Sequence, residues 1–396
     1  METEARRDHT ISRARHARQR STRLRRGRRR RTPRTAGRRS TNALEPDARA
    51  PARPPDRSGV GRRRNLSGEP RCGPRRGDRR HPRHRRRGRC VNPGAAILFT
   101  GGVLTGGVYI VSVLDRLFAG ITARSPERVG RLLLDPFRSV ALLMSQRRTV
   151  TERPDREAWA LAPALLAGLA AVAFTAIPLT PGLAIADVPV GIVLFGAALV
   201  QVMVAVFLHG WSANSIFSVI GGYRFAALAL SMGIPFSLVL ITTAIPAESL
   251  SVGVIIGSQA ELWNVLRQPL GLPIYLLTAL GFTFWGPFHH PDAVDLAGGS
   301  QAETSGTALL AWRTARAALL VSAAVMGSAA FLGGPLGPWL PGWAWSILKT
   351  VALLTVMIWF GHQTARPRME NVVKFGWLVL LPLALVDVFV SGALTL

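Results

Sequence analysis

The sequence predicts an all-α, polytopic integral membrane protein with about eight transmembrane helices. Of its 396 residues, 48% are hydrophobic. Beyond residue 91 the apolar residues gather in runs near the ~20 residues that a helix needs to cross a ~30 Å hydrocarbon core. Lipid offers no hydrogen-bond partner to a backbone N–H or C=O group, so runs of this length are expected to be helical.

Composition divides the chain into a tail and a membrane domain. Residues 1–90 hold 32 Arg and eight acidic residues, so they carry +24 of the formal net charge of +27. This segment is rich in Arg, Pro and Gly and poor in aliphatic residues, which predicts a disordered tail. Residues 91–396 form the predicted eight-helix membrane domain.

The origin of the tail has three interpretations. It could be a mis-called start, with Val91 as the true first residue. It could contact nucleic acid or anionic lipid through its Arg side chains, or it could be inert. A targeting segment is disfavoured, because no apolar region with a small-residue cleavage site joins it to the rest of the chain. We expect no nucleic-acid partner.

The two cysteines, Cys72 and Cys90, both lie in the tail. This disfavours a disulfide framework and a cysteine-based metal site. An iron–sulfur cluster needs about four thiolates, so we expect the chain to hold none.

Each apolar run supplies one predicted span, and Gly or Pro within a run is tolerated in a membrane helix. The eight spans are predicted near residues 95–118, 158–178, 188–208, 225–247, 269–288, 307–332, 343–362 and 374–395.

Basic residues favour one side of the membrane. The loops at 119–157, 209–224 and 363–373 carry nearly all the arginines between spans. The loop at 286–306 alternates onto the same side, and the three remaining loops hold only Arg267. Cytoplasmic loops are enriched in Lys and Arg, so we expect these four loops in the cytoplasm of a bacterium, with the protein in its plasma membrane. Both ends of the membrane domain would then face outward. An Arg-rich tail opposes that placement, which favours the mis-called start.

One polar stretch stands between two apolar runs, HGWSANSIFSVIGGYR at 209–224. We expect a cytoplasmic loop with glycine turns, closed by Arg224. Its WSANS…GGYR pattern resembles the Gly-Trp-Ser-x-Asn-Ser…Arg stretch of the H subunit of NADH-quinone oxidoreductase, called subunit 1 in mitochondria. The related membrane subunit of energy-converting hydrogenases is similar.

Further short motifs resemble the same family in the same order. They are RSPERVG at 124–130, QPLG at 268–271, GPFHHPDAVDLAGG at 286–299, ETSG at 303–306, FLGG at 331–334, WSILKT at 345–350 and FGWLVLLPL at 375–383. The resemblance covers about residues 95–396, and the family also has eight spans.

The resemblance implies a role in a respiratory complex. Members of this family hold no flavin or iron–sulfur centre, so no cofactor is expected in this chain. Their cytoplasmic loops meet the peripheral-arm subunits and help to form the chamber in which quinone, the substrate of the complex, is reduced. Carboxylates then lead toward the proton-pumping subunits of the membrane arm. The implied partners are these subunits, quinone and the lipid bilayer.

Most of the carboxylates that the family implies are missing. Buried carboxylates are rare and usually functional, so their replacement suggests a divergent member that has lost or weakened its proton path. The positions of the family's polar residues are taken by Leu228, Met232, Gly233, Phe282, Thr283, Phe284, Trp285, His289 and Val294.

The remaining polar residues are the candidates. For the quinone chamber or the peripheral-arm contact they are Arg124, Arg128, Arg224, His289, Asp292, Asp295 and Glu303. Asp387 is the one acid well inside a span, so it is the candidate proton site, although it could also bond to a neighbouring helix or lie at a shallower depth. No catalytic residue is predicted.

Several candidates also have simpler interpretations. The arginines of the first loop could serve only to orient the protein. His289 and His290 could belong to a solvated loop, because adjacent histidines rarely reach one metal ion together. We expect no metal site. Arg313 and Arg316 are expected to extend toward the cytoplasmic surface.

Two other functions remain open. The chain could be a non-catalytic anchor of a hydrogenase-like or antiporter-like complex. Less well supported is a stand-alone transporter, because the two halves show no internal repeat.

Overall fold

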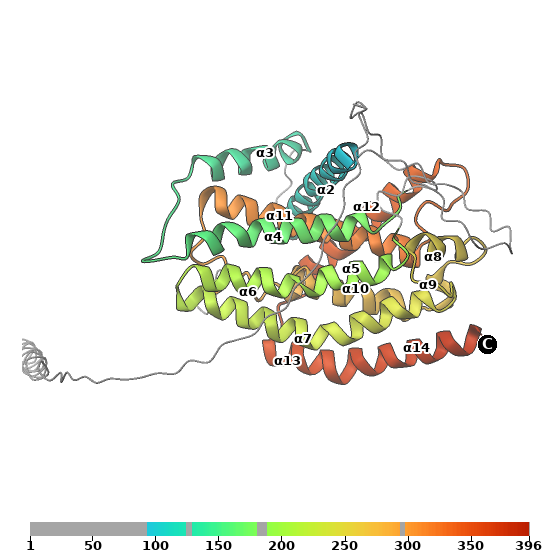
Figure 1. Cartoon of the computed structure of the whole chain (residues 1–396). Coiled ribbons are helices and arrows are strands. Elements are labelled where there is room, and N and C mark those ends of the chain that lie inside the picture. Colours follow the sequence, from blue (N-terminus) through green and yellow to red (C-terminus); the bar gives the residue numbers. More distant parts are fainter. Residues whose placement is uncertain (1–92, 124–128, 180–187, 294–297, 396) are drawn as a thin grey trace, which may run out of the picture. The chain divides into compact units, whose positions relative to one another are not determined.

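The computed structural model describes residues 93–123, 129–179, 188–293 and 298–395, and these residues form helices joined by turns. The predicted tail at 1–90 lies outside the described residues. So do three candidate residues of the membrane domain, Arg124, Arg128 and Asp295. In chain order (Figure 1) the elements are α2 (Pro93–Thr122), α3 (Val129–Ser145), α4 (Arg156–Thr175), α5 (Gly191–Val200), α6 (Val202–Ser212), α7 (Ile216–Ala244), α8 (Val252–Ser258), α9 (Asn264–Arg267), α10 (Gly271–Phe282), the 3-10 turn η1 (Gly286–Phe288), α11 (Gly306–Phe331), α12 (Gly342–Gln363), α13 (Met369–Phe375), the π-helical turn η2 (Gly376–Leu380) and α14 (Leu381–Thr395).

Eight helical segments of the described chain are long and apolar enough to cross a membrane, which confirms the predicted class and number of spans. They are Ile97–Thr122, Arg156–Thr175, Gly191–Ser212, Ile216–Ala244, Gly271–Phe288, Gly306–Phe331, Gly342–Gln363 and Met369–Leu394.

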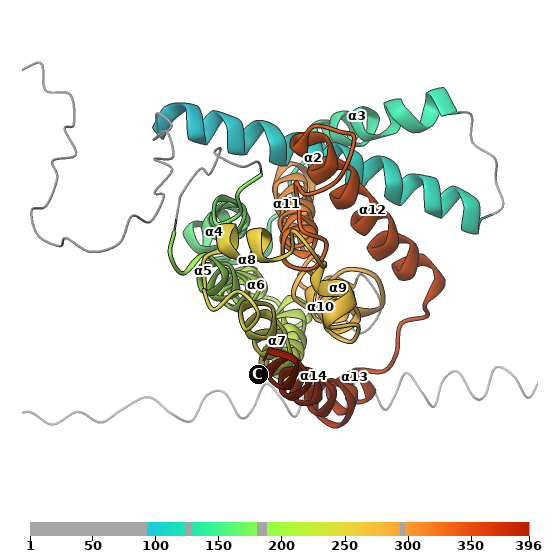
Figure 2. The ribbon, with the colours of Figure 1, turned by 90° about the vertical axis from the view of Figure 1, so that its right-hand side faces the viewer.

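Helix α11 is the buried centre of the bundle. Every residue from Ala317 to Phe331 is buried. Many of these residues are Ala, Ser or Gly, and small side chains let neighbouring backbones approach closely, so van der Waals packing holds the helices together in lipid. Helices α2, α4, α10 and α12 pack around α11 (Figure 2).

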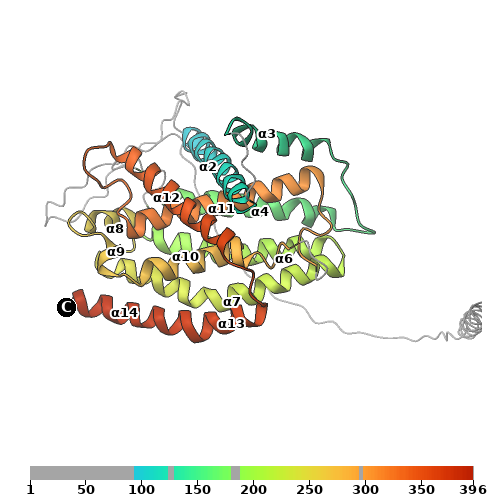
Figure 3. The same cartoon turned by 180° about the vertical axis from the view of Figure 1, so that it is seen from behind.

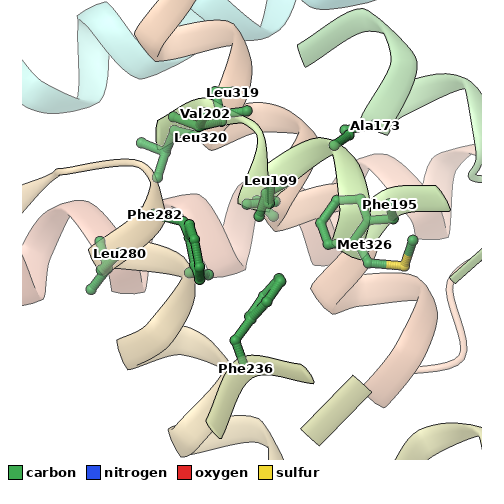
Figure 4. Close-up of a cluster of buried hydrophobic side chains, with 14 of the residues drawn as sticks. Ala173, Phe195, Leu199, Val202, Phe236, Leu280, Phe282, Leu319, Leu320 and Met326 are labelled. Atoms are coloured by element: carbon green, nitrogen blue, oxygen red, sulfur yellow. The ribbon is translucent and has the colours of Figure 1, made fainter. Parts of the chain in front are cut away.

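Aromatic side chains fill the space between α5, α7 and α10. The ring centroid of Phe236 lies 5.0 Å from that of Phe282 and 6.3 Å from that of Phe195. Figure 4 shows these rings with Leu199 and Met326 in one cluster. The interior of this part of the bundle is therefore apolar and close-packed.

The stretch 209–224 is not the loop that the sequence suggested. Helix α6 continues to Ser212 and α7 begins at Ile216, so only residues 213–215 connect them. Asn214 adopts a left-handed backbone with φ of 49°, a conformation that Asn tolerates better than most residues. A Cβ on Gly210 would lie 2.6 Å from the carbonyl oxygen of Ser218, so glycine is needed where the two helices meet.

Part of the predicted loop 119–157 is helix α3, which packs against α2 and α11. It buries Leu132 and Leu143 and leaves Leu134, Phe137 and Leu142 more than 60% exposed. The helix has only seventeen residues and includes Asp135 and Arg138, so the sequence does not predict it as a span. Its apolar surface on both sides explains why such a short segment stays helical.

Candidate functional site

Four connecting segments meet at one end of the bundle, on the left in Figure 1. The segment before α4 is bonded to the α6–α7 turn. The hydroxyl of Thr151 donates to the carbonyl oxygen of Ala213 at 2.6 Å, and the backbone N–H of Asp155 donates to the carbonyl oxygen of Ser212 at 2.9 Å. These two connections are therefore held together directly.

The segment before α11 joins the same group. The Thr149 backbone N–H donates to the hydroxyl of Ser305 at 2.8 Å. The hydroxyl of Ser215 donates to the carboxylate of Glu303 at 2.9 Å. The predicted residue Glu303 thus connects the α6–α7 turn to the segment before α11.

The connection between α12 and α13 completes the group. Nε2 of His290 lies 2.6 Å from the carbonyl oxygen of Pro367. The guanidinium of Arg224 donates to the carbonyl oxygen of Gly298 at 2.8 Å, so this predicted residue also fixes the segment before α11. We call this end of the bundle the knitted end (Figure 3). Its four connecting segments are 146–155, 212–215, the α10–α11 connection with its described parts 286–293 and 298–305, and 364–368.

The centre of the knitted end is the fully buried carboxylate of Asp292. Hydrogen bonds reach it from the hydroxyl of Ser300 and from Nε2 of Gln301. The indole N–H of Trp312 lies 3.0 Å from both carboxylate oxygens. The guanidinium of Arg316 forms a salt bridge with it at 3.0 Å. Asp292 therefore has a donor on every side and one cation.

These neighbours keep Asp292 ionised. Burial by itself favours the neutral acid, but the charge of Arg316 and the hydrogen bonds from Ser300 and Trp312 outweigh it, so the pKa of Asp292 lies below its ordinary value of 3.8. The site therefore holds a fixed ion pair at neutral pH.

Arg316 does not extend to the surface, so that prediction was wrong. Its side chain is 13% exposed and points inward to Asp292. Its guanidinium also lies 4.4 Å from the ring centroid of Trp285 and 5.5 Å from that of Phe284, where each ring face favours a cation. The buried carboxylate of Asp292 lies within reach of the Arg316 guanidinium and attracts it more strongly than water at the surface would. Arg313, three residues earlier, is exposed.

His209 is a member of the site that the sequence did not point to. Its ring stacks on Trp312 with centroids 3.9 Å apart, and its Nε2 lies 3.2 Å from the hydroxyl of Thr304. His209 is fully buried, and its Nδ1 has no hydrogen-bond partner among the described residues. The sequence does place His209 at the end of an apolar run, which could have indicated a buried histidine. The loop predicted at 209–224 instead assigned this residue to solvent.

The two adjacent histidines are not in a solvated loop. His290 is only 8% exposed. Burial and the nearby charge of Arg316 lower the pKa of His289 to about 3, so its imidazole is neutral at pH 7. Among the described residues, no three His, Cys, Asp or Glu side chains gather in a way that could hold a metal ion.

The last candidate, Asp387, lies far from this group. It is eighteen residues beyond the start of α13, which corresponds to ~27 Å along a helix. It is 2% exposed, and its Oδ2 has no hydrogen-bond partner among the described residues. The structure therefore brings together Arg224, His289, Asp292 and Glu303 and leaves Asp387 at the other end.

Apolar side chains occupy several positions at which the resemblance implied polar residues. Leu228, Met232 and Phe284 are fully buried, and Phe282 is 1% exposed. The ring centroid of Phe284 lies 5.4 Å from that of Phe225. These side chains pack against one another, so they offer no polar route between the knitted end and the interior.

Comparison with known proteins gives one consistent family. The family described as NADH dehydrogenase matches residues 95–392. The first of the NADH-quinone oxidoreductase H subunits of Rhodopseudomonas palustris (strain BisB5) is 34% identical over 275 residues, which cover 67% of this chain and 86% of the relative. The second H subunit of Syntrophobacter fumaroxidans is 31% identical over 300 residues, covering 72% and 90%. The H subunit of Anoxybacillus flavithermus is 30% identical over 274 residues, covering 67% and 82%.

The match extends over all eight spans and includes every described segment of the knitted end. The chain therefore belongs to the NADH dehydrogenase family, together with the relatives named as H subunits of NADH-quinone oxidoreductase.

Proposed function

We propose that this chain is a membrane subunit of a NADH-quinone oxidoreductase of the respiratory complex I type, and that its knitted end meets the peripheral-arm subunits and helps to form the quinone chamber. The observation that carries the proposal is the direct bonding of four connecting segments at that end, within a chain that matches the family over residues 95–392. Bonds between segments far apart in sequence give a fixed surface, as docking a partner requires.

Charge supports a cytoplasmic position for the knitted end in a bacterial plasma membrane. Six of its exposed or flanking side chains are arginines, whereas the opposite end carries the cations Arg267 and Lys349 with the acids Glu248 and Glu261. Arginine-rich connections favour the cytoplasmic side. The six are Arg147, Arg148, Arg153, Arg156, Arg366 and Arg368.

The chemistry of the site suits binding and positioning. His289 is neutral, so the N–H of its imidazole can donate a hydrogen bond to a quinone carbonyl. The adjacent ion pair of Asp292 and Arg316 supplies a fixed field without a mobile proton. The chain contributes no redox centre to this proposal; electrons and protons would come from the partners and the solvent.

Photo-crosslinking in the native membrane tests the proposal. A photoreactive residue at Arg153 or Arg366 should capture an iron–sulfur subunit of the peripheral arm. The same residue at Glu261, on the opposite end, should capture none and serves as the matched control. Gentle detergent extraction should co-purify those subunits. Extraction of the chain alone, with no capture at either arginine, would instead support a stand-alone transporter.

A second candidate is an anchor in such a complex that takes no part in proton translocation. The packing of Leu228, Met232 and Phe282 favours it, because apolar side chains cannot relay a proton. The proton yield per quinone reduced in the purified complex separates the two candidates. A yield well below that of a relative with the carboxylates supports the anchor, and a full yield rejects it.

A further inference from the structure

A second buried polar group lies between α7, α10 and α14, at the end of the bundle opposite the knitted end. Nε2 of Gln268 donates to the carbonyl oxygen of Thr242 at 2.9 Å and to the hydroxyl of Ser391 at 2.7 Å. Gln268 is 1% exposed and Asp387, one turn before Ser391, is 2% exposed. The group therefore has no access to bulk water through these side chains.

Two oxygen atoms in this group lack a donor. Oε1 of Gln268 and Oδ2 of Asp387 are both buried and have no hydrogen-bond partner among the described residues. Both side chains belong to residues beside Gly271: a Cβ on Gly271 would lie 3.1 Å from Oδ2 of Asp387 and 3.5 Å from Cβ of Gln268. Because residue 271 is glycine, the carboxyl fits against the first turn of α10.

The orientation of the amide is determined by its other neighbour. The carbonyl oxygen of Thr242 can only accept a hydrogen bond, so the NH₂ group of Gln268 must face it. If Oε1 and Nε2 of Gln268 changed places, the amide oxygen would face the carbonyl oxygen of Thr242 and the hydrogen bond would be lost. Oε1 of Gln268 consequently remains an acceptor that needs a donor.

No cation among the described residues compensates Asp387. It takes part in none of their salt bridges. On the elements that pack against α14, the titratable side chains are Tyr223 and Arg224 near the knitted end of α7 and Tyr275 in α10, whose hydroxyl donates to the carbonyl oxygen of Ala323. Arg267 precedes Gln268 in the chain but makes no ion pair with Asp387.

A buried carboxylate with no cation and with one oxygen that lacks a donor is costly in its ionised form, and the group takes up a proton instead. We propose that Asp387 and Gln268 form a proton-binding site: Asp387 is present as the neutral acid, and its Oδ2–H is the donor that Oε1 of Gln268 lacks. One proton satisfies both oxygens. The inference does not depend on quinone binding, so it can fail while the proposed function stands.

Infrared spectroscopy of the intact complex tests the site. At neutral pH the carbonyl stretch of a protonated carboxylic acid should appear, shift in D₂O, and be lost in Asp387→Asn. The matched control Asp135→Asn removes an aspartate that lies 3.6 Å from Arg116, so it should leave the band unchanged. Because Asn imitates the neutral acid in shape, Asp387→Asn should assemble at the wild-type level.

Other outcomes would overturn the proposal. A spectrum in which Asp387→Asn removes only a carboxylate band would show that the group is ionised. A carbonyl band that appears only when Na⁺ is withdrawn would show that the two oxygens bind a metal cation. A second variant, Gln268→Met, keeps the volume and removes the acceptor, so it should shift the Asp387 band; an unchanged band would show that the two side chains do not share a proton.

Discussion

Two buried aspartates in this chain have opposite surroundings. Asp292 is enclosed by donors and a guanidinium, so it stays ionised. Asp387 lies beside Gly271, and its Oδ2 has no donor among the described residues. The contrast shows that burial alone does not decide the role of an acid; its nearest partners do.

Removing the partner of Asp292 should destabilise the protein strongly. Arg316→Met keeps the aliphatic volume but leaves a buried carboxylate without its cation, which typically costs ~3–5 kcal/mol. Thermal unfolding in detergent would show a markedly lower midpoint. Arg313→Met, on the same helix but exposed, is the matched control and should change little. The double variant Asp292→Asn with Arg316→Met should recover part of the loss; equal midpoints for Arg313→Met and Arg316→Met would contradict the ion pair.

Acid should weaken the fold through His289. Its pKa is about 3 in the folded protein against 6.5 in an ordinary environment, so between these values the unfolded chain binds a proton that the folded chain does not. The contribution of neutral His289 to the free energy of unfolding is complete above pH 6.5 and falls as the pH drops toward 3. Protonation of Asp292 adds a further loss of stability below its ordinary pKa of 3.8. The unfolding midpoint at pH 7 and pH 5 measures this dependence.

A single variant isolates the histidine's share of that acid sensitivity. His289→Gln should lose less stability between pH 7 and pH 5 than the wild type, because Gln does not titrate. Glu370→Gln, at an exposed position, should keep the wild-type loss. An unchanged pH dependence in His289→Gln would mean that His289 is already charged in the folded protein.

At the scale of elements, the helical hairpin of α6 and α7 supports the site and contributes His209 and Arg224 to it. Its three-residue turn and its glycines bring the two helices together and leave room for the segment before α11. A Cβ on Gly221 would lie 2.5 Å from the carbonyl oxygen of Pro291 and would overlap the backbone nitrogen of Ser300. The hairpin therefore positions Asp292 through backbone contact.

Adding one methyl group at that contact should disturb the site. Gly221→Ala should lower stability by ~1–3 kcal/mol or more, because backbone atoms cannot move aside as a side chain can. It should also reduce assembly into the complex. Gly168→Ala, in α4 with no atom within 4 Å of its added Cβ, should be neutral or slightly stabilising. Equal behaviour of the two variants would rule out the close contact.

The sequence predicted elements better than their contacts. Run length placed all eight spans within a few residues, except the start of α7, where polar residues on a helix looked like a loop. The same bias hid His209 and the turn at 213–215. The partner of Asp292 could not be predicted, because Arg316 follows it by 24 residues and only the packing of α11 brings them together. The structure brings the candidates Asp292, Arg224 and Glu303 to one end of the bundle, whereas Arg316, expected at the surface, points inward.

At the scale of the whole molecule, the two ends of the bundle differ in chemistry. The knitted end is rich in arginine and in bonds between connections, whereas the opposite end joins α7, α10 and α14 through a neutral polar group. The apolar packing between them, including Phe236 and Phe282, separates the two polar regions. A subunit built in this way can dock a soluble partner at one end while it stays sealed through its centre.

The position of the knitted end in the membrane is the central claim. In a chain whose Cys72 and Cys90 are replaced, single cysteines at Arg153, Arg366 and Glu261 would be labelled with a membrane-impermeant thiol reagent in right-side-out and inverted vesicles. We predict that the first two react only in inverted vesicles and that Glu261→Cys reacts only in right-side-out ones. Labelling of Arg153→Cys and Arg366→Cys from opposite sides, or of both from the outside, would contradict this placement.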